Sequence, residues 1–148
     1  MKKNILLLTL FSCVSIFSQK NEFTFEGETE FIMYQKVDEP NSKIPMELIK
    51  NVEGSITYNE VFDSYRIVNH NLITDTFTKM TLNYSRLSNS GEKIYKNIES
   101  DDPMFSEYYV TDNLVNKGSL LITLANSTIL QGEKYFVSFL YQNFIYKK

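Results

Sequence analysis

The chain has 148 residues, a net charge of −3 and 43% hydrophobic residues. One domain of this size can bury about two-thirds of the surface of its unfolded chain, so no further domain is needed to form a core. The mildly acidic balance, without a basic cluster, argues against nucleic acid as a partner. After the first twenty residues no apolar run approaches the length of a transmembrane helix.

The N-terminus has the layout of a secretory signal peptide. Lys2 and Lys3 precede an apolar run from Ile5 to Phe17, and Ser18 is a small residue where the chain turns polar. Positive charge, a short apolar segment and a small residue at the cleavage point are the three parts of such a leader. The run is too short to span a bilayer of about 30 Å. We therefore predict a signal peptide over residues 1–18 and export to the periplasm or the extracellular space.

Cys13 introduces an alternative route of export. Leu10-Phe11-Ser12-Cys13 resembles a bacterial lipobox, in which the cysteine becomes the lipidated N-terminus. Phe11 stands where a small residue is usual, so cleavage after Ser18 is the preferred prediction. The mature chain, residues 19–148, is predicted to form a single β domain, and it would contain no cysteine and no disulfide.

Aromatic content, alternating apolar positions and frequent turn signals predict a β-rich domain. The segment 38–51 contains Pro40 and Pro45 and is predicted to be a loop, with one helical turn at 46–50. The predicted strands cover residues 23–25, 29–37, 55–59, 65–69, 77–87, 92–99, 104–114, 119–124 and 134–146.

Two Asn-x-Gly turns predict hairpins, at residues 89–91 and 116–118. A three-residue hairpin places its third residue in the left-handed region, which glycine adopts freely. We therefore expect positive φ at Gly91 and Gly118.

The turns also set a register for each hairpin. In the first, Ser88 opposite Glu92 places Leu82 opposite Ile98, and the residues that then share one face are Met80, Leu82, Ile94 and Ile98. In the second, Val115 opposite Ser119 places Val110 opposite Leu124. The residues on one face of that hairpin are Tyr108, Val110, Leu114, Leu120, Ile122 and Leu124. A shift of one residue would scatter both sets over two faces.

The sequence offers few residues for catalysis. His70 is the only histidine, so a Ser-His-Asp relay would have to use it and a multi-histidine metal site is excluded. Its neighbours, Asn69 and Asn71, predict an exposed turn in which His70 is dispensable for activity. There is no Gly-x-Ser-x-Gly motif, and the mature chain lacks a cysteine nucleophile. We predict no enzyme activity, no cofactor and no metal; a small hydrolase is the most distant alternative.

The ten tyrosines and eleven phenylalanines are the remaining signal. A tyrosine combines a large apolar ring with a hydroxyl that can bind a ligand. Three tyrosines fall on or near the predicted apolar faces, and two aliphatic residues lie beside them. The predicted ligand-binding residues are Met80, Leu82, Tyr84, Tyr108 and Tyr135; ordinary core packing is the alternative explanation for them.

Three architectures fit these strands: an up-and-down barrel, a two-sheet sandwich and a small outer-membrane barrel. We predict an all-β, antiparallel meander of about eight strands, with the barrel favoured over the sandwich. The consecutive hairpins, the long last strand and the export signal resemble lipocalin-like (calycin-type) domains over residues 52–146, although the lipocalin Gly-x-Trp motif is absent. The abundance of Asn, Lys, Ile, Tyr and Phe resembles exported proteins of Bacteroidota.

The lipocalin resemblance implies a barrel that holds a small apolar ligand. The first expected function is therefore a non-enzymatic, exported binding protein. The alternative is an envelope interaction or structural protein that docks on an envelope protein and has no cavity.

Overall fold

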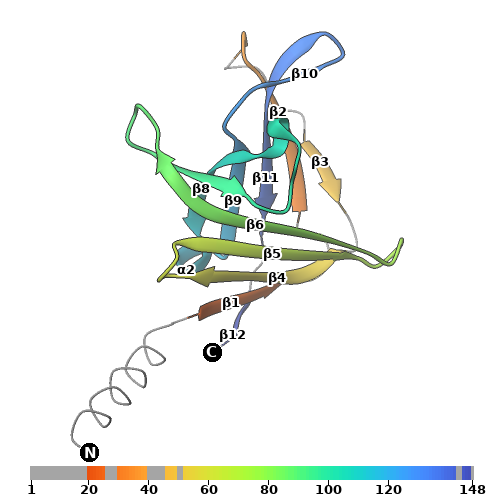
Figure 1. Ribbon diagram of the computed structural model, residues 1–148. Coiled ribbons are helices and arrows are strands. Elements are labelled where there is room, and N and C mark those ends of the chain that lie inside the picture. Colours follow the sequence, from red (N-terminus) through yellow and green to blue (C-terminus); the bar gives the residue numbers. More distant parts are fainter. Residues whose placement is uncertain (1–19, 26–29, 40–45, 50–51, 143–144, 148) are drawn as a thin grey trace, which may run out of the picture.

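The computed structural model describes residues 20–25, 30–39, 46–49, 52–142 and 145–147 (Figure 1). The predicted signal peptide and Cys13 lie outside these residues. The chain is all-β, and its strands form one antiparallel sheet that curls into a half-barrel. The predicted all-β, barrel-like fold is confirmed. No helix in the described ranges is long and apolar enough to cross a membrane.

The strands are short to medium in length, and two helical turns interrupt them. The elements in chain order are β1 (Lys20–Phe25), β2 (Glu30–Lys36), β3 (Met46–Ile49), β4 (Val52–Asn59), β5 (Ser64–Asn71), β6 (Thr76–Leu87), β7 (Lys93–Asn97), η1 (Pro103–Phe105), β8 (Glu107–Asn113), α2 (Leu114–Lys117), β9 (Ser119–Leu124), β10 (Thr128–Leu130), β11 (Glu133–Tyr141) and β12 (Ile145–Lys147).

The strands at the centre of the sheet follow the order of the chain, as in a meander, whereas the strands near its two edges do not. Its order is β12-β1-β4-β5-β6-β7-β8-β9-β11-β2-β3, with β10 paired to β11. Strands β4 to β9 follow the chain, as predicted. The N-terminal strands separate, because β1 pairs with β4 whereas β2 pairs with β11. In Figure 1, β4, β5 and β6 lie nearly across the direction of β9, β11 and β2, which gives the sheet its curl.

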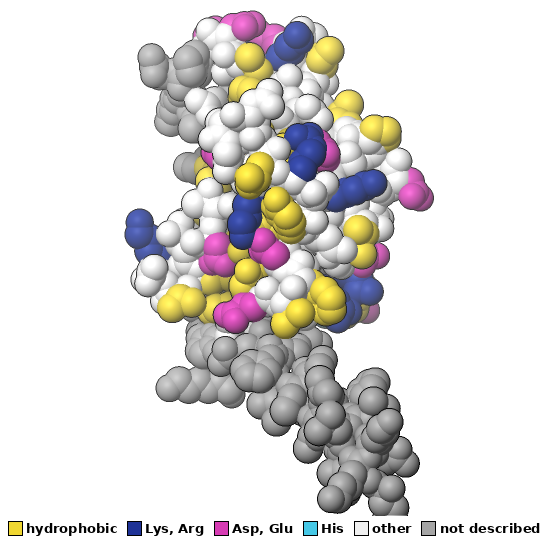
Figure 2. All heavy atoms as spheres, turned by 60° about the vertical axis from the view of Figure 1, so that its left-hand side comes forward, with side chains coloured by type: hydrophobic (Ala, Val, Ile, Leu, Met, Phe, Trp, Pro, Cys, Tyr) yellow, Lys and Arg dark blue, Asp and Glu magenta, His cyan; other side chains and the backbone are white. Residues whose placement is uncertain are grey.

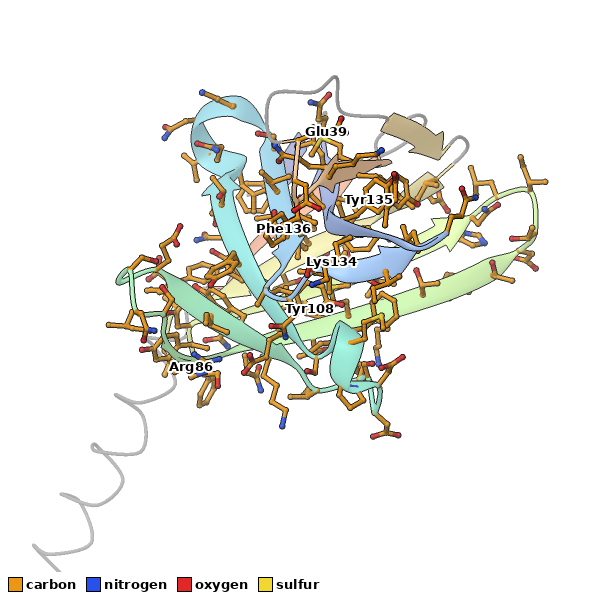
Figure 3. The ribbon with its side chains drawn as sticks, turned by 90° about the horizontal axis from the view of Figure 1, so that it is seen from above. Glu39, Arg86, Tyr108, Lys134, Tyr135 and Phe136 are labelled. Atoms are coloured by element: carbon orange, nitrogen blue, oxygen red, sulfur yellow. The ribbon has the colours of Figure 1, made fainter. Side chains whose placement is uncertain are left out.

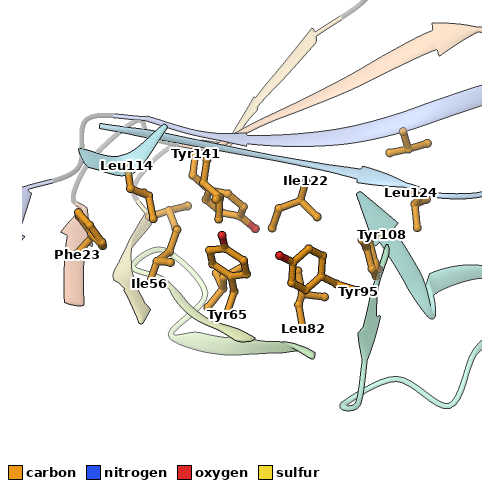
Figure 4. Close-up of a cluster of buried hydrophobic side chains, with 14 residues drawn as sticks. Phe23, Ile56, Tyr65, Leu82, Tyr95, Tyr108, Leu114, Ile122, Leu124 and Tyr141 are labelled. Atoms are coloured by element: carbon orange, nitrogen blue, oxygen red, sulfur yellow. The ribbon is translucent and has the colours of Figure 1, made fainter. Parts of the chain in front are cut away.

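The core fills the concave side of the sheet (Figure 4). Alternate residues of each strand point inward, as in Leu120, Ile122 and Leu124 of β9, all fully buried. Burying one such aliphatic side chain contributes about 1.5–3 kcal/mol. The other core residues are Phe23, Val52, Ile56, Tyr65, Ile67, Leu82, Tyr95, Tyr108, Leu114, Val137 and Tyr141.

Both predicted glycine turns have the expected conformation. Gly91 has φ +85° and Gly118 has φ +57°. The Gly91 amide donates to the carbonyl of Ser88 at 3.0 Å, and the Ser88 amide donates to the carbonyl of Glu92 at 2.8 Å. The first turn therefore closes between the predicted residues.

The predicted register of the first hairpin fails a few residues beyond its turn. The pairing shifts between Tyr84 and Arg86, where a β-bulge adds one residue to β6. Leu82 consequently lies opposite Asn97 instead of Ile98, and Tyr84 lies opposite Tyr95 instead of Lys96. Leu82 is still fully buried, but Ile98 is 57% exposed, so the predicted contact between them is wrong. Beyond a bulge, the pairing of the two strands is shifted by one residue. A side chain that was expected on the buried face can therefore lie on the exposed face.

The second hairpin is shifted by two residues from its predicted register. Val110 pairs with Ile122 instead of Leu124, because the connection is longer than three residues and contains the helical turn α2. The Asp112 carboxylate accepts a hydrogen bond from the Leu114 amide at 2.8 Å and starts that turn. A shift of two preserves the faces, since the side-chain period of a strand is two. Of the six residues predicted to share one face, the five that lie in β8 and β9 therefore still do so, and Leu114, now in α2, packs into the same core.

Three other segments differ from the prediction. Residues 46–49 form strand β3, paired with β2, where a helical turn was predicted. The predicted strand 104–114 begins as η1, because Pro103 starts a 3₁₀ turn and Asp102 accepts a hydrogen bond from the Met104 amide at 2.9 Å. The predicted strand 134–146 is divided into β11 and β12, and β10 was not predicted.

Candidate functional site

A narrow pocket opens on the concave side of the half-barrel, between β5–β6 and β11. Its volume is about 160 Å³. We call it the inner pocket; its lining residues are Ile67, Asn69, Thr78, Lys79, Met80, Phe139 and Tyr141. Most of the exposed lining is apolar.

Strand pairing brings this lining together. Ile67 of β5 lies opposite Met80 of β6, and Asn69 lies opposite Thr78. Phe139 and Tyr141 point inward from β11, on the other side of the pocket. Ile67 and Tyr141 belong to the buried core, while Met80 and Phe139 pack against it. The pocket is therefore a gap at the edge of the core.

Asn69 is the polar exception in the lining. It follows Tyr65 and Ile67 on the inward face of β5, because side chains alternate along a strand. Its Oδ1 atom is buried and accepts no hydrogen bond from any described residue. Its Nδ2 donates to the Tyr141 hydroxyl at 3.5 Å, which is long for a hydrogen bond. Within the described residues, the Asn69 amide is therefore only partly paired.

Of the five predicted ligand-binding residues, only Met80 lines the inner pocket. Leu82 and Tyr108 are core residues. Tyr84 is 42% exposed, with the Lys93 ammonium 5.9 Å from its ring centre. The hydroxyl of Tyr135 donates to Glu133 at 2.7 Å, and Figure 3 shows Tyr135 beside Phe136, away from Tyr108. The structure does not bring these five residues together.

The other lining residues were not identified from the sequence. Asn69 did carry a signal, namely a polar residue in an alternating series whose earlier members, Tyr65 and Ile67, are apolar. Phe139 and Tyr141 carried none, because nothing in the sequence pairs β11 with the rest of the pocket.

A cluster of tyrosines and carboxylates lies next to the pocket along β5. Asp63 accepts hydrogen bonds from the hydroxyls of Tyr95 at 3.0 Å and Tyr58 at 3.2 Å, and from the Lys93 ammonium. Tyr65 donates to Asp112 at 2.9 Å, and its ring lies 4.7 Å from that of Tyr58.

These contacts determine the protonation of the cluster. Burial, together with the neighbouring carboxylate of Asp63, raises the pKa of Tyr58 to about 12. The same two causes raise the pKa values of Tyr65, beside Asp112, and Tyr95. Burial pushes the pKa of Asp63 upward, but its three hydrogen bonds outweigh this and lower it. At neutral pH the tyrosines are therefore neutral donors to a charged carboxylate, which suits a structural network.

His70 is not the exposed turn residue that the sequence predicted. It lies within β5, its side chain is 19% exposed, and its ring stacks on Phe77 with centres 4.1 Å apart. Nδ1 lies 3.0 Å from Glu53, and Nε2 lies 2.9 Å from Asp75. Hydrogen bonds to these two carboxylates raise the pKa of His70. The ring thus clamps the β5–β6 turn to β4.

This clamp should make stability depend on pH. The pKa of His70 is raised above its unfolded value of about 6.5, so the clamp contributes fully below that pH. Its contribution is lost as the pH rises through the folded-state pKa. The urea midpoint of the wild type should therefore be lower at about pH 9 than at about pH 6. The same difference should be smaller in His70→Gln. An equal fall in both proteins would contradict the clamp.

Three further pockets among the described residues are larger in volume and more polar in their lining. One of about 270 Å³ lies beside α2, one of about 340 Å³ beside the β6–β7 turn, and one of about 370 Å³ between the end of β2 and the β10–β11 turn. Among the described residues, no group of three or more His, Cys, Asp or Glu side chains could hold a metal ion.

Comparison with known proteins adds no assignment. No family model, curated protein or solved structure matches the chain. The functional argument therefore depends on the geometry of the inner pocket.

Proposed function

We propose that this protein is a non-enzymatic binding protein that holds a small apolar molecule in the inner pocket. The observation that carries the proposal is an apolar lining of Ile67, Met80 and Phe139 around about 160 Å³. An enclosed cavity of about 150 Å³ lined by Leu, Ile and Phe binds benzene in another protein, which sets the size of ligand that such a volume can hold. The ligand is accordingly a single ring or a short chain, and a whole fatty acid is too large.

Binding without a reaction is supported by the chemistry around the pocket. In its described lining, aliphatic, aromatic, amide and hydroxyl groups surround the space, and the charged group there, Lys79, is exposed. His70 is on the other face of β5 and is held by two carboxylates. The nearby hydroxyls of Tyr65 and Tyr95 already donate to carboxylates.

Filling the pocket should abolish binding. We expect toluene to bind the wild type with a dissociation constant on the order of 1 mM, because so small a ligand offers few contacts. Met80→Trp places a larger side chain in the pocket and should remove this binding. Met104→Trp is the matched control, since Met104 is exposed on η1. Ligand-observed NMR measures both; binding that survives Met80→Trp contradicts the proposed site.

Docking on an envelope protein is the second candidate. It is favoured by large apolar residues that stand in water: Val61 and Phe62 in the β4–β5 turn and Val115 on α2. The view in Figure 2 separately shows hydrophobic and acidic side chains next to one another in the lower part of the face that it draws. If no apolar probe binds the wild type, docking on an envelope protein becomes the preferred function in place of ligand binding.

Both functions would be performed outside the cytoplasm. We propose this from the charged and apolar leader, Lys2 to Ser18. Mass spectrometry of the protein recovered from its host should find a chain that begins near Gln19. A diacylated Cys13 would instead indicate a lipoprotein, and an intact Met1 would contradict export by this leader.

A further inference from the structure

Strand β6 is paired along only half of one of its edges. On the first edge, its residues from Thr76 to Asn83 all pair with β5. On the second edge, pairing with β7 covers β6 from Leu82 onward. The β5–β6 hairpin therefore continues past the end of β7, toward the right in Figure 1. Among the described residues, no strand pairs with Thr76–Met80 on that second edge, which we call the open edge.

The chain leaves β6 in a turn that follows β7. The Ile98 amide donates to the Thr81 carbonyl at 2.9 Å and extends the pairing by one residue. The Glu99 amide then donates to the Asn97 side chain at 3.1 Å, which closes a turn at residues 98–99. The first four residues of β6, residues 76–79, are exposed. The open edge is therefore in contact with water.

The backbone groups of Phe77 and Lys79 point toward the open edge. Along an antiparallel strand, successive residues direct their N–H and C=O groups to opposite sides. Thr81 uses its carbonyl on the β7 side, where it accepts from Ile98. Counting back from Thr81 in steps of two gives Lys79 and Phe77. Two N–H and two C=O groups at strand spacing are thus available to another main chain.

The open edge also borders the inner pocket, whose lining includes Thr78, Lys79 and Met80. Side chains alternate along a strand, so those of Thr78 and Met80 share the inward face and that of Lys79 is on the outer face, opposite Val68. Lys79 therefore reaches the pocket with its backbone. A strand added along the open edge would direct every second side chain toward the pocket.

We propose that the open edge binds an extended segment of a partner protein as an additional antiparallel strand. Main-chain hydrogen bonds to Phe77 and Lys79 hold the segment, as in other peptides that join the edge of a sheet. Its residues opposite Thr78 and Met80 are apolar, because they face the inner pocket. Its residue opposite Lys79 is acidic, because cross-strand neighbours of opposite charge attract. The inference goes beyond the proposed function and does not require it, because the backbone of β6 holds the segment.

The probe for this inference is the capped pentapeptide Val-Glu-Val-Thr-Val. Its valines face inward when its glutamate lies opposite Lys79. For so short a ligand we expect a dissociation constant on the order of 1 mM, measured by NMR titration of the purified protein. Hydrogen exchange of the Phe77 and Lys79 amides should slow about fivefold or more when the peptide is bound. The amide of Met80, which faces β5, is the internal reference, and unchanged rates at Phe77 and Lys79 would overturn the proposal.

Two N-methylated peptides are matched controls. N-methylation of the glutamate removes the N–H group that faces Lys79, whereas N-methylation of the central valine removes one that faces away from β6. The first change should weaken binding about tenfold, because one hydrogen bond is lost. The second should weaken it much less. Equal weakening by both would overturn strand addition.

The acidic preference has its own test. Replacing the glutamate of the peptide with lysine should weaken binding to the wild type about threefold, and it should weaken binding to Lys79→Ala less. Equal weakening in both proteins would overturn the role of Lys79.

Two further outcomes identify what occupies the edge. Slow exchange at Phe77 and Lys79 in the free protein that becomes fast on dilution would mean that a second copy of this chain covers the edge, and it would overturn binding of a partner segment. Toluene binding tests the inner pocket separately. Peptide binding without toluene binding supports this inference and overturns the proposed function, and toluene binding without peptide binding does the reverse.

Discussion

Tyr108→Ala is expected to destabilise the protein by about 3–5 kcal/mol, the cost of removing a buried aromatic ring from a packed core. Tyr108 is 1% exposed and lies on β8, with Tyr95 opposite on one side and Leu124 on the other. Burial also raises the pKa of its hydroxyl to about 12. Urea unfolding followed by circular dichroism measures the loss.

Tyr84→Ala is the matched control. The same side chain is removed, but Tyr84 is exposed on β6 and contacts the Tyr95 ring at 6.2 Å between centres. The expected loss is below about 1 kcal/mol. Equal losses in the two variants would mean that Tyr108 is not a core residue.

Asp63→Ala should cost about 2–5 kcal/mol in the free energy of unfolding, the sum of two contributions. The hydroxyl of Tyr95, a residue that is 3% exposed, would lose its acceptor, and an unpaired buried donor costs about 1–3 kcal/mol. Asp63 also has φ +43°, which costs alanine about 1–2 kcal/mol. Because its pKa is lowered, the stability that Asp63 contributes is present above about pH 4 and is lost as the pH falls through the folded-state pKa.

Asp63→Asn separates the charge from the geometry. Asparagine tolerates positive φ and keeps an oxygen that accepts from Tyr95, so it should recover about half of the loss or more. Denaturant unfolding of both variants at neutral pH makes the comparison. If asparagine is as damaging as alanine, the ion pair with Lys93 dominates instead.

The sequence was informative about faces and turns. The bounds of β9, Ser119–Leu124, were predicted correctly, and positive φ at Gly91 and Gly118 follows from turn chemistry that only glycine meets without cost. The second hairpin kept its buried face despite an error of two residues in its register. Local alternation determines which side chains point inward, and that property survives an even shift.

The same sequence patterns could not predict which residues pair across the sheet. The bulge beside Ser85 has no glycine or proline to mark it, yet it turns Ile98 outward. The inner pocket needs Asn69 from β5 beside Tyr141 from β11, 72 residues later in the chain. Alternation predicts that both point inward, but it contains no information about which strands become neighbours. The sequence therefore predicted Met80 as a ligand-binding residue, but it did not predict the other residues that line the inner pocket with it.

The pairing of β2 with β11 has a consequence for the order in which the protein folds. The ion pair between Lys36 and Glu133 joins residues 97 positions apart in the chain, at neighbouring strands near one edge of the sheet. Closing so long a loop costs entropy before any contact repays it, and such topologies fold slowly. β2 can pair with β3 early, but it must wait for β11 to be synthesised before it can join the rest of the sheet. The central meander from β4 onward can pair in chain order, but the half-barrel is completed only when nearly the whole chain is available.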